Sequence, residues 1–244
     1  GREPTKDGGH VEVLKKIADI GYKGVEGAGY GMSPTEFRKF VGDLGMVVSS
    51  YFGPFPDAEH ANEFIETAQG LGVTETVSGF WIDDFASVDA IKKTADKVRE
   101  ASERLRAAGL TLCLHNHWME FEPVEGKLAV EHLIEFFPEV NLELDIYWCS
   151  AFGANDPVAI AKQHRNRMPL MHVKDGPLVR GEPQVAVGRG KVDIAGAIGA
   201  IDPEVTKWLI VELDECSTDM MGAVEQSYRY LVGNGLASGN KPVE

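Results

Sequence analysis

Short apolar segments alternate along the whole chain with longer amphipathic segments, and this alternation limits the folds that the chain can adopt. Seven of the apolar segments are rich in β-branched residues and have the length of strands buried on both faces, as a parallel sheet requires. The seven expected strands are residues 23–27, 46–52, 74–81, 110–117, 140–147, 169–174 and 208–214.

Amphipathic helical patterns lie before and between these strands. The clearest helix start is the SPTEF segment, where Ser33 is a capping residue, Pro34 a first helical residue and Glu36 the second half of a capping box. The eight expected helices are residues 11–20, 33–44, 58–71, 87–108, 130–137, 157–163, 194–201 and 219–231.

Strict strand–helix alternation indicates an α/β protein with a parallel sheet, either an open doubly wound sheet or a closed barrel. No GxGxxG or GxxxxGK phosphate loop follows an early strand, which argues against a dinucleotide fold. We therefore predict a single (β/α)8 TIM-barrel domain over residues 1–244. The chain opens on a loop and a helix, so we expect the first β-strand of the barrel to be absent from this sequence.

The charge balance restricts the partners. The 244 residues contain 24 Lys and Arg against 38 Asp and Glu, a net charge of −14 that repels phosphate backbones and argues against nucleic acid. No apolar run reaches the roughly 18–20 residues that cross a bilayer, and no signal-peptide pattern is visible, so no membrane partner is expected. Three scattered cysteines without CxxC spacing fit a reduced, cytoplasmic protein.

Ionisable residues gather at the carboxyl ends of the expected strands, where barrels place their reacting groups. Period-two alternation puts His115 with His117, His172 with Lys174, and Glu212 with Asp214 on common faces. Imidazoles and carboxylates that converge from separate strands form a mixed N/O site, which suits Mn²⁺, Co²⁺, Zn²⁺ or Mg²⁺. The side chains at these ends are Glu26, Tyr51, Trp81, His115, His117, Asp145, His172, Lys174, Glu212 and Asp214.

Each of these residues also has a purely structural interpretation. Asp145 or Glu212 alone could equally cap a helix or pair with a lysine, a lone His172 is more often structural, and Glu143 points the same way as Asp145 but deeper. Together, however, four consecutive strand ends carry ligand-type residues after apolar runs. Burying such charges unpaired would cost several kcal/mol, and a divalent cation removes that cost. The combination therefore favours a metal site.

The segments GYKGVEGAGY, LHNHWMEF, LELDIYW followed by GANDP, PLMHVKD, VGRGKVDI and WLIVELDE resemble the xylose isomerase-like TIM barrels known as sugar phosphate isomerases/epimerases. The resemblance implies a divalent metal, most often Mn²⁺, at the barrel mouth, with Asp145, His172 and Glu212 among its ligands. The fourth ligand falls on Glu120 of the HNHxxE pattern, and His115 is the alternative.

The resemblance also implies an activity: enolisation of a sugar or keto-sugar at a metal-bound carbonyl/hydroxyl pair, as in an isomerase or epimerase. A lyase or dehydratase acting on a cyclitol or a 3-keto-glycoside, similar to inosose dehydratases, is the alternative, and a non-catalytic sugar-binding or partner subunit is the third reading. Barrels of this kind commonly associate, so a homo-oligomer is expected.

Candidate acid–base groups follow from the shared strand faces. His117 and Lys174 are the candidates to move protons, and the pKa of a lysine beside a metal is expected to fall toward neutrality. Glu212 is expected to act as ligand and base together. Glu26, His115 and Trp148 are candidates to bind the substrate.

Overall fold

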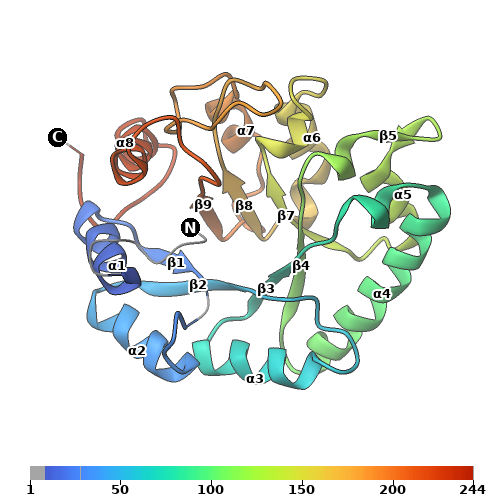
Figure 1. Ribbon diagram of the computed structural model, residues 1–244, viewed down its shortest axis with the longest axis horizontal. Coiled ribbons are helices and arrows are strands. Elements are labelled where there is room, and N and C mark those ends of the chain that lie inside the picture. Colours follow the sequence, from blue (N-terminus) through green and yellow to red (C-terminus); the bar gives the residue numbers. More distant parts are fainter. Residues whose placement is uncertain (1–8, 28, 244) are drawn as a thin grey trace.

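The computed structural model describes residues 9–27 and 29–243. Its main sheet has seven parallel strands in the order β1-β2-β3-β4-β7-β8-β9, and the strands curve into a nearly closed barrel (Figure 1). The α/β barrel class and all seven expected strands are confirmed. The strands are β1 Gly24–Glu26, β2 Val47–Phe52, β3 Glu75–Ser78, β4 Thr111–His115, β7 Asn141–Asp145, β8 Leu170–Val173 and β9 Trp208–Val211.

Within the described residues, eight α-helices lie around the outside of the strands (Figure 1), and each corresponds to an expected helix. They are α1 Gly9–Ile20, α2 Pro34–Asp43, α3 Ala61–Leu71, α4 Val88–Ala107, α5 Ala129–Phe136, α6 Pro157–His164, α7 Ile194–Gly199 and α8 Met220–Gly233. The short elements are the hairpin strands β5 Pro123–Val124 and β6 Lys127–Leu128, and the 3₁₀ turns η1 Ile82–Phe85, η2 Met119–Phe121, η3 Trp148–Ser150 and η4 Arg165–Arg167.

Local sequence explains where the helices begin. At the start of α2, the Ser33 hydroxyl accepts a hydrogen bond from the Glu36 N–H, and the Glu36 carboxylate accepts one from the Ser33 N–H at 2.9 Å. This is the capping box that the SPTEF segment predicts. Among the described helices, none is both long and apolar enough to cross a lipid bilayer.

Two apolar clusters hold the barrel together. The larger one fills the space between the strands and the helices. The smaller one comprises Val77, Cys113 and Leu170, with Trp208 and Ile210 packed against it. Cys113, Leu170 and Ile210 each lie two residues before an ionisable strand-end residue, so period-two alternation puts them on the same face as those residues, one layer lower. On these three strands the layer below the ionisable residues is therefore apolar, whereas β7 places the buried Glu143 two residues before Asp145.

The barrel has a seam between β1 and β9. Within residues 9–27 and 29–243 no backbone pairing joins these two strands. All residues of β1 and β9 are half-buried, whereas those of β3 and β8 are fully buried. A Cβ on Gly24 would lie 3.2 Å from the Trp208 indole, so the indole covers the Gly24 backbone across the seam.

Candidate metal centre

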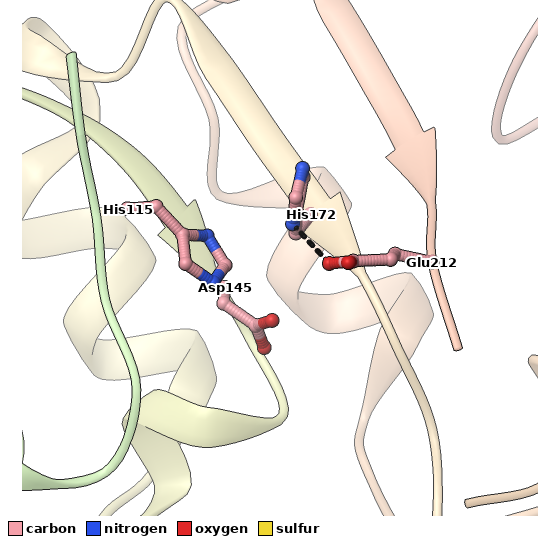
Figure 2. Close-up of side chains that lie close together, drawn as sticks. All are labelled: His115, Asp145, His172 and Glu212. Atoms are coloured by element: carbon pink, nitrogen blue, oxygen red, sulfur yellow. Dashed lines mark ion pairs between the residues drawn. The ribbon is translucent and has the colours of Figure 1, made fainter. Parts of the chain in front are cut away.

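Four neighbouring strands, β4, β7, β8 and β9, bring four ligand-type side chains to one point at the barrel mouth (Figure 2). One ligand atom from each of His115, Asp145, His172 and Glu212 lies within 4.8 Å of all the others. His115 and Asp145 are the last residues of β4 and β7, His172 lies within β8 and Glu212 follows β9. The parallel register sets Asp145 directly beside His172.

The four side chains offer unused lone pairs. His172 Nδ1 lies 2.7 Å from Glu212 Oε2, and neither atom has an aligned hydrogen-bond partner among the described residues. Asp145 Oδ2 is likewise buried without one, and His115 turns its Nδ1 toward Glu143 at 3.4 Å, which leaves Nε2 as its ligand atom. Two imidazoles and two carboxylates form a donor set that suits a divalent transition metal or Mg²⁺. These residues fit the cation that the strand ends predict.

Lys174 lies beside this group. Its Nζ is 3.1 Å from Asp145 Oδ2, 2.8 Å from Glu212 Oε2 and 2.9 Å from Asp214 Oδ2. Burial lowers the pKa of Lys174, but the three carboxylates outweigh burial and raise it above its usual value. The depressed pKa that the sequence predicts applies to a lysine beside a bound metal and stays a prediction. Lys174 is therefore a buried, charged ammonium group.

The pKa values of the two histidines of the group are shifted in opposite directions. Burial lowers the pKa of His172, but Glu143 and Glu212 outweigh burial and raise it well above its usual value. Burial, together with the positive charges of His172 and Lys174, lowers the pKa of His115. The carboxylates near His172 thus favour its positive form, and a bound cation would take the place of that proton.

Glu120 lies outside the ligand group. It is buried in η2, where its Oε2 accepts a hydrogen bond from the His117 N–H at 3.0 Å. Its neighbours include the apolar side chains of Phe80 and Phe121. Burial raises its pKa to about 8. The structure thus joins His115, the alternative choice, to Asp145, His172 and Glu212, because the Glu120 carboxylate closes the turn that follows β4.

Glu26 contacts the ligand group from below. Its Oε1 lies 3.0 Å from His172 Nε2, and its Oε2 accepts a hydrogen bond from the Ser50 hydroxyl at 2.6 Å. Burial raises the pKa of Glu26, but the contact with His172 outweighs burial and lowers it. Both carboxylate oxygens are thus engaged within the protein, which makes Glu26 a partner of His172 more than a free sugar-binding group.

A cavity of about 890 Å³ opens above the group. His115, His117, Glu212 and Asp214 form its polar side. Burial lowers the pKa of His117, and the positive charge of Lys174 lowers it further. Trp148 contacts one of these lining residues, because its Nε1 donates a hydrogen bond to Asp214 Oδ2 at 3.2 Å.

Aromatic rings also line the cavity, namely those of Phe52, Phe55, Phe80 and Trp81. Trp81 is 67% exposed and stacks on His117, with a ring-centroid distance of 6.0 Å and an interplanar angle of 20°. Trp81 was predicted to lie at a strand end, but no role in the site was predicted for it. An exposed tryptophan beside a strand end is the signal that could have indicated a substrate-facing ring.

The sequence model of the xylose isomerase-like TIM barrel family matches residues 14–231. The chain belongs to this family. The match spans all seven strands of the barrel and the four residues of the ligand group. No curated protein matches the chain.

Solved structures of the same fold are similar to this xylose isomerase-like barrel. A sugar phosphate isomerase/epimerase from Parabacteroides distasonis has a TM-score of 0.77 at 23% identity, and the match covers 98% of this chain and 92% of that one. The IolI protein with a bound zinc atom has a TM-score of 0.71 at 18% identity, with 90% of each chain covered. An L-ribulose 3-epimerase has a TM-score of 0.67 at 20% identity, with 93% and 88% covered.

Proposed function

We propose that this protein is a divalent-metal-dependent isomerase or epimerase that enolises a sugar or keto-sugar. The observation that carries the proposal is the convergence of His115, Asp145, His172 and Glu212 at the mouth of the barrel. These four residues would hold the cation, with Mn²⁺ preferred and Co²⁺, Zn²⁺ and Mg²⁺ as alternatives. The sugar phosphate isomerase/epimerase and the zinc-binding protein among the structural neighbours support this reading.

A divalent cation in this site supplies Lewis acidity, which polarises a carbonyl group and so acidifies the adjacent C–H. The other tasks fall to the chain itself. Glu212 is partly exposed toward the cavity, and its pKa is lowered: burial raises it, but His172 and Lys174 outweigh burial. Its ionised carboxylate is placed to accept a proton from carbon.

His117 and Lys174 are the other two ionisable groups that we propose to take part in the reaction. His117 lines the cavity as a largely neutral imidazole, so it accepts a proton on one face of the substrate and returns it. The charged Lys174, which pairs with Glu212 at 2.8 Å, would balance the negative charge that enolisation creates. Trp81 and Trp148 offer ring faces that pack against the apolar side of a sugar.

The charged state of Lys174 also favours a second candidate, a lyase or dehydratase acting on a cyclitol or 3-keto-glycoside. After the same proton removal, a cationic acid beside the cavity would protonate a departing oxygen. A mannonate dehydratase from Streptococcus suis is among the similar structures, with a TM-score of 0.66 at 13% identity. The two candidates share the site and differ in the fate of the second proton.

The test combines metal content with proton exchange. Unchanged protein purified without chelator is expected to contain about one equivalent of metal by elemental analysis. It should also exchange the C–H next to the carbonyl of a keto-sugar from a screened panel with deuterated solvent, as followed by NMR. Asp145→Asn should lose both the metal and the exchange, because it removes one of the two carboxylates among the four ligands.

Asp156→Asn is the matched control, because Asp156 caps α6 away from the site and Asn caps equally well. It should retain the metal and the exchange. Absence of metal in the unchanged chain, even after Mn²⁺ is added, would refute the metal site. Metal without any exchange or product across the panel would favour the non-catalytic sugar-binding subunit.

A further inference from the structure

We propose that Glu143, assisted by Glu26, is a positioning residue that fixes the orientation and tautomer of both histidine ligands from beneath the metal site. This inference rests on the proposed function and concerns two residues that are not among the four ligands. Glu143 touches neither the cavity nor the proposed cation, and it acts through His115 and His172.

The geometry places one carboxylate against two imidazoles. Glu143 Oε2 lies 3.2 Å from His172 Nε2 and 3.4 Å from His115 Nδ1. Glu143 is completely buried, and neither of its carboxylate oxygens has an aligned hydrogen-bond partner among the described residues. Glu26 approaches the same His172 nitrogen at 3.0 Å, so two carboxylates flank one side of that ring.

This contact assigns a task to each ring nitrogen of His172. Nε2 faces Glu143 and Glu26, whereas Nδ1 faces Glu212 at 2.7 Å. An imidazole that carries its hydrogen on the carboxylate side presents a lone pair on the other side, which is how metal-bound histidines are commonly held. His172 would therefore bind the cation through Nδ1.

The same logic applies to His115. Its Nδ1 faces Glu143, which leaves Nε2 as the ligand atom. Strand pairing fixes this contact, because His115 of β4 lies directly beside Glu143 of β7 in the parallel register. One buried carboxylate thus sets the direction of two ligands from two different strands, and each strand also contributes to the sheet that holds the site.

Glu75 shows what an interior carboxylate does when it serves structure alone. It lies in β3, is also buried and pairs with Lys207, a cation from the opposite side of the barrel floor. Glu143, in contrast, has only imidazoles and Glu26 as ionisable partners at ion-pair or hydrogen-bond distance among the described residues. Burying a carboxylate that has only such partners costs folding free energy. A positioning role toward the histidines explains why Glu143 is nevertheless a carboxylate.

The experiment compares Glu143→Gln with Glu75→Gln in the full chain. Mn²⁺ affinity is measured by calorimetric titration of metal-free protein, and the visible spectrum of the Co²⁺-loaded protein reports the ligand geometry. We expect Glu143→Gln to weaken Mn²⁺ binding by about 10- to 100-fold and to change the Co²⁺ spectrum, with one equivalent still bound. Glu75→Gln should leave both unchanged while lowering the thermal midpoint.

Three other outcomes would overturn the positioning role of Glu143. Equal Mn²⁺ affinities and equal Co²⁺ spectra in the two variants would overturn the positioning role and leave the proposed function standing. No Mn²⁺ binding by the unchanged chain would overturn both. Two equivalents in the unchanged chain, with one lost in Glu143→Gln, would make Glu143 a ligand of a second cation and overturn the positioning role.

Glu26→Gln keeps the proposal testable if Glu143→Gln does not fold. Glu26 shares the His172 contact, whereas no ion pair joins it to His115 among the described residues, so an intermediate loss of affinity is expected. An unchanged Mn²⁺ affinity in Glu26→Gln would count against the proposal, because the His172 tautomer would then not depend on the carboxylates behind it.

Discussion

Lys174 shows how one side chain can be both structural and chemical. Its ammonium group lies within 3.1 Å of three carboxylates, and the lysine itself is almost fully buried. Without this positive charge, Asp145, Glu212 and Asp214 would repel one another at the mouth of the barrel. The lysine therefore supports the ligand group and at the same time places a positive charge beside Glu212 and Asp214, which line the cavity.

Lys174→Met should separate these two roles. In the presence of chelator, we expect it to lower the free energy of unfolding by about 3 kcal/mol, because it leaves buried carboxylates without their cation. Proton exchange of the substrate should fall by roughly 10²- to 10⁴-fold. Urea denaturation and NMR exchange measure the two effects.

Lys207→Met is the control for this prediction. Lys207 pairs with one carboxylate, that of Glu75, and its side chain is half exposed, so its loss should cost less stability and leave proton exchange intact. If Lys174→Met were as stable and as active as this control, the ammonium group would have no role in the site.

The positions of three ligands were predictable because strand geometry is regular. A strand end after an apolar run points into the mouth, which is the reason that Asp145, His172 and Glu212 could be identified from the sequence. The choice between His115 and Glu120 was not predictable in the same way. It depends on a 3₁₀ turn in which Glu120 bonds to the His117 N–H, and no periodic pattern reports such a turn.

At the scale of elements, one carboxylate organises the long connection between β8 and α7. Asp175 Oδ2 accepts hydrogen bonds from the N–H groups of Gly188 and Gly190, each at 2.9 Å, and Oδ1 accepts them from Gly176 and Val192. A Cβ on Gly190 would lie 2.1 Å from Asp175 Oδ1, so glycine is needed there for close approach. The connection is thereby fixed directly after Lys174.

Asp175→Asn should loosen this connection. The amide group would turn a donor toward backbone N–H groups, leaving buried donors unpaired at a cost of about 2–3 kcal/mol. Urea denaturation measures the loss, and Asp193→Asn is the control because Asn replaces Asp well as the cap of α7. Equal stability of the two variants would show that the connection is held by other contacts.

A pH effect is expected at the end of α6. Burial, with a smaller contribution from Arg167, lowers the pKa of His164 to about 4. The unfolded chain, with an ordinary histidine pKa near 6.5, therefore binds the proton more readily. Stability linked to this residue is present above about pH 6.5 and is lost as the pH falls toward 4.

His164→Gln should remove this dependence, because glutamine cannot be protonated. Between pH 7 and 4.5 the unchanged chain should lose about 2 kcal/mol more than the variant, measured by urea denaturation at each pH. His60→Gln is the contrast, since the contact with Asp57 raises the pKa of His60 and the sign is opposite. Parallel pH profiles for the unchanged chain and His164→Gln would contradict the prediction.

The elements themselves were largely predictable, since period and caps mark each helix and strand. Contacts between distant segments were not. The sequence showed PLMHVKD and VGRGKVDI as separate segments, whereas the structure joins them through the bonds of Asp175 to residues 13–17 positions later. Such bonds leave no period in the sequence, because only the folded connection brings the groups together.

At the scale of the whole molecule, the seam between β1 and β9 is the feature that departs from a closed barrel. Each of these strands pairs on one side only among the described residues, and the indole of Trp208 covers Gly24 where a backbone ladder would run in a closed sheet. The sequence predicted one strand fewer than eight. It could not show that a side chain from the barrel floor would lie across the gap.

The seam predicts uneven protection of backbone amides. A strand with one free edge opens more easily than a strand with two paired neighbours, so β1 and β9 should exchange their amide hydrogens faster than β4 and β7. Hydrogen–deuterium exchange with peptide-level mass spectrometry measures this difference. Protection at Gly24–Glu26 and Trp208–Val211 equal to that of β4 and β7 in dilute protein would contradict the prediction.

The same measurement, repeated over a range of protein concentrations, tests the expected homo-oligomer. Unpaired strand edges invite association, so a second copy lying over the seam would slow exchange in β1 and β9 as concentration rises, while β4 and β7 stay unchanged. Association elsewhere on the molecule would leave the seam fast and protect other segments. β1 ends at Glu26, and β9 ends one residue before Glu212. A copy that covers the seam would therefore also hold in place Glu26 and the ligand residue Glu212 of the metal site.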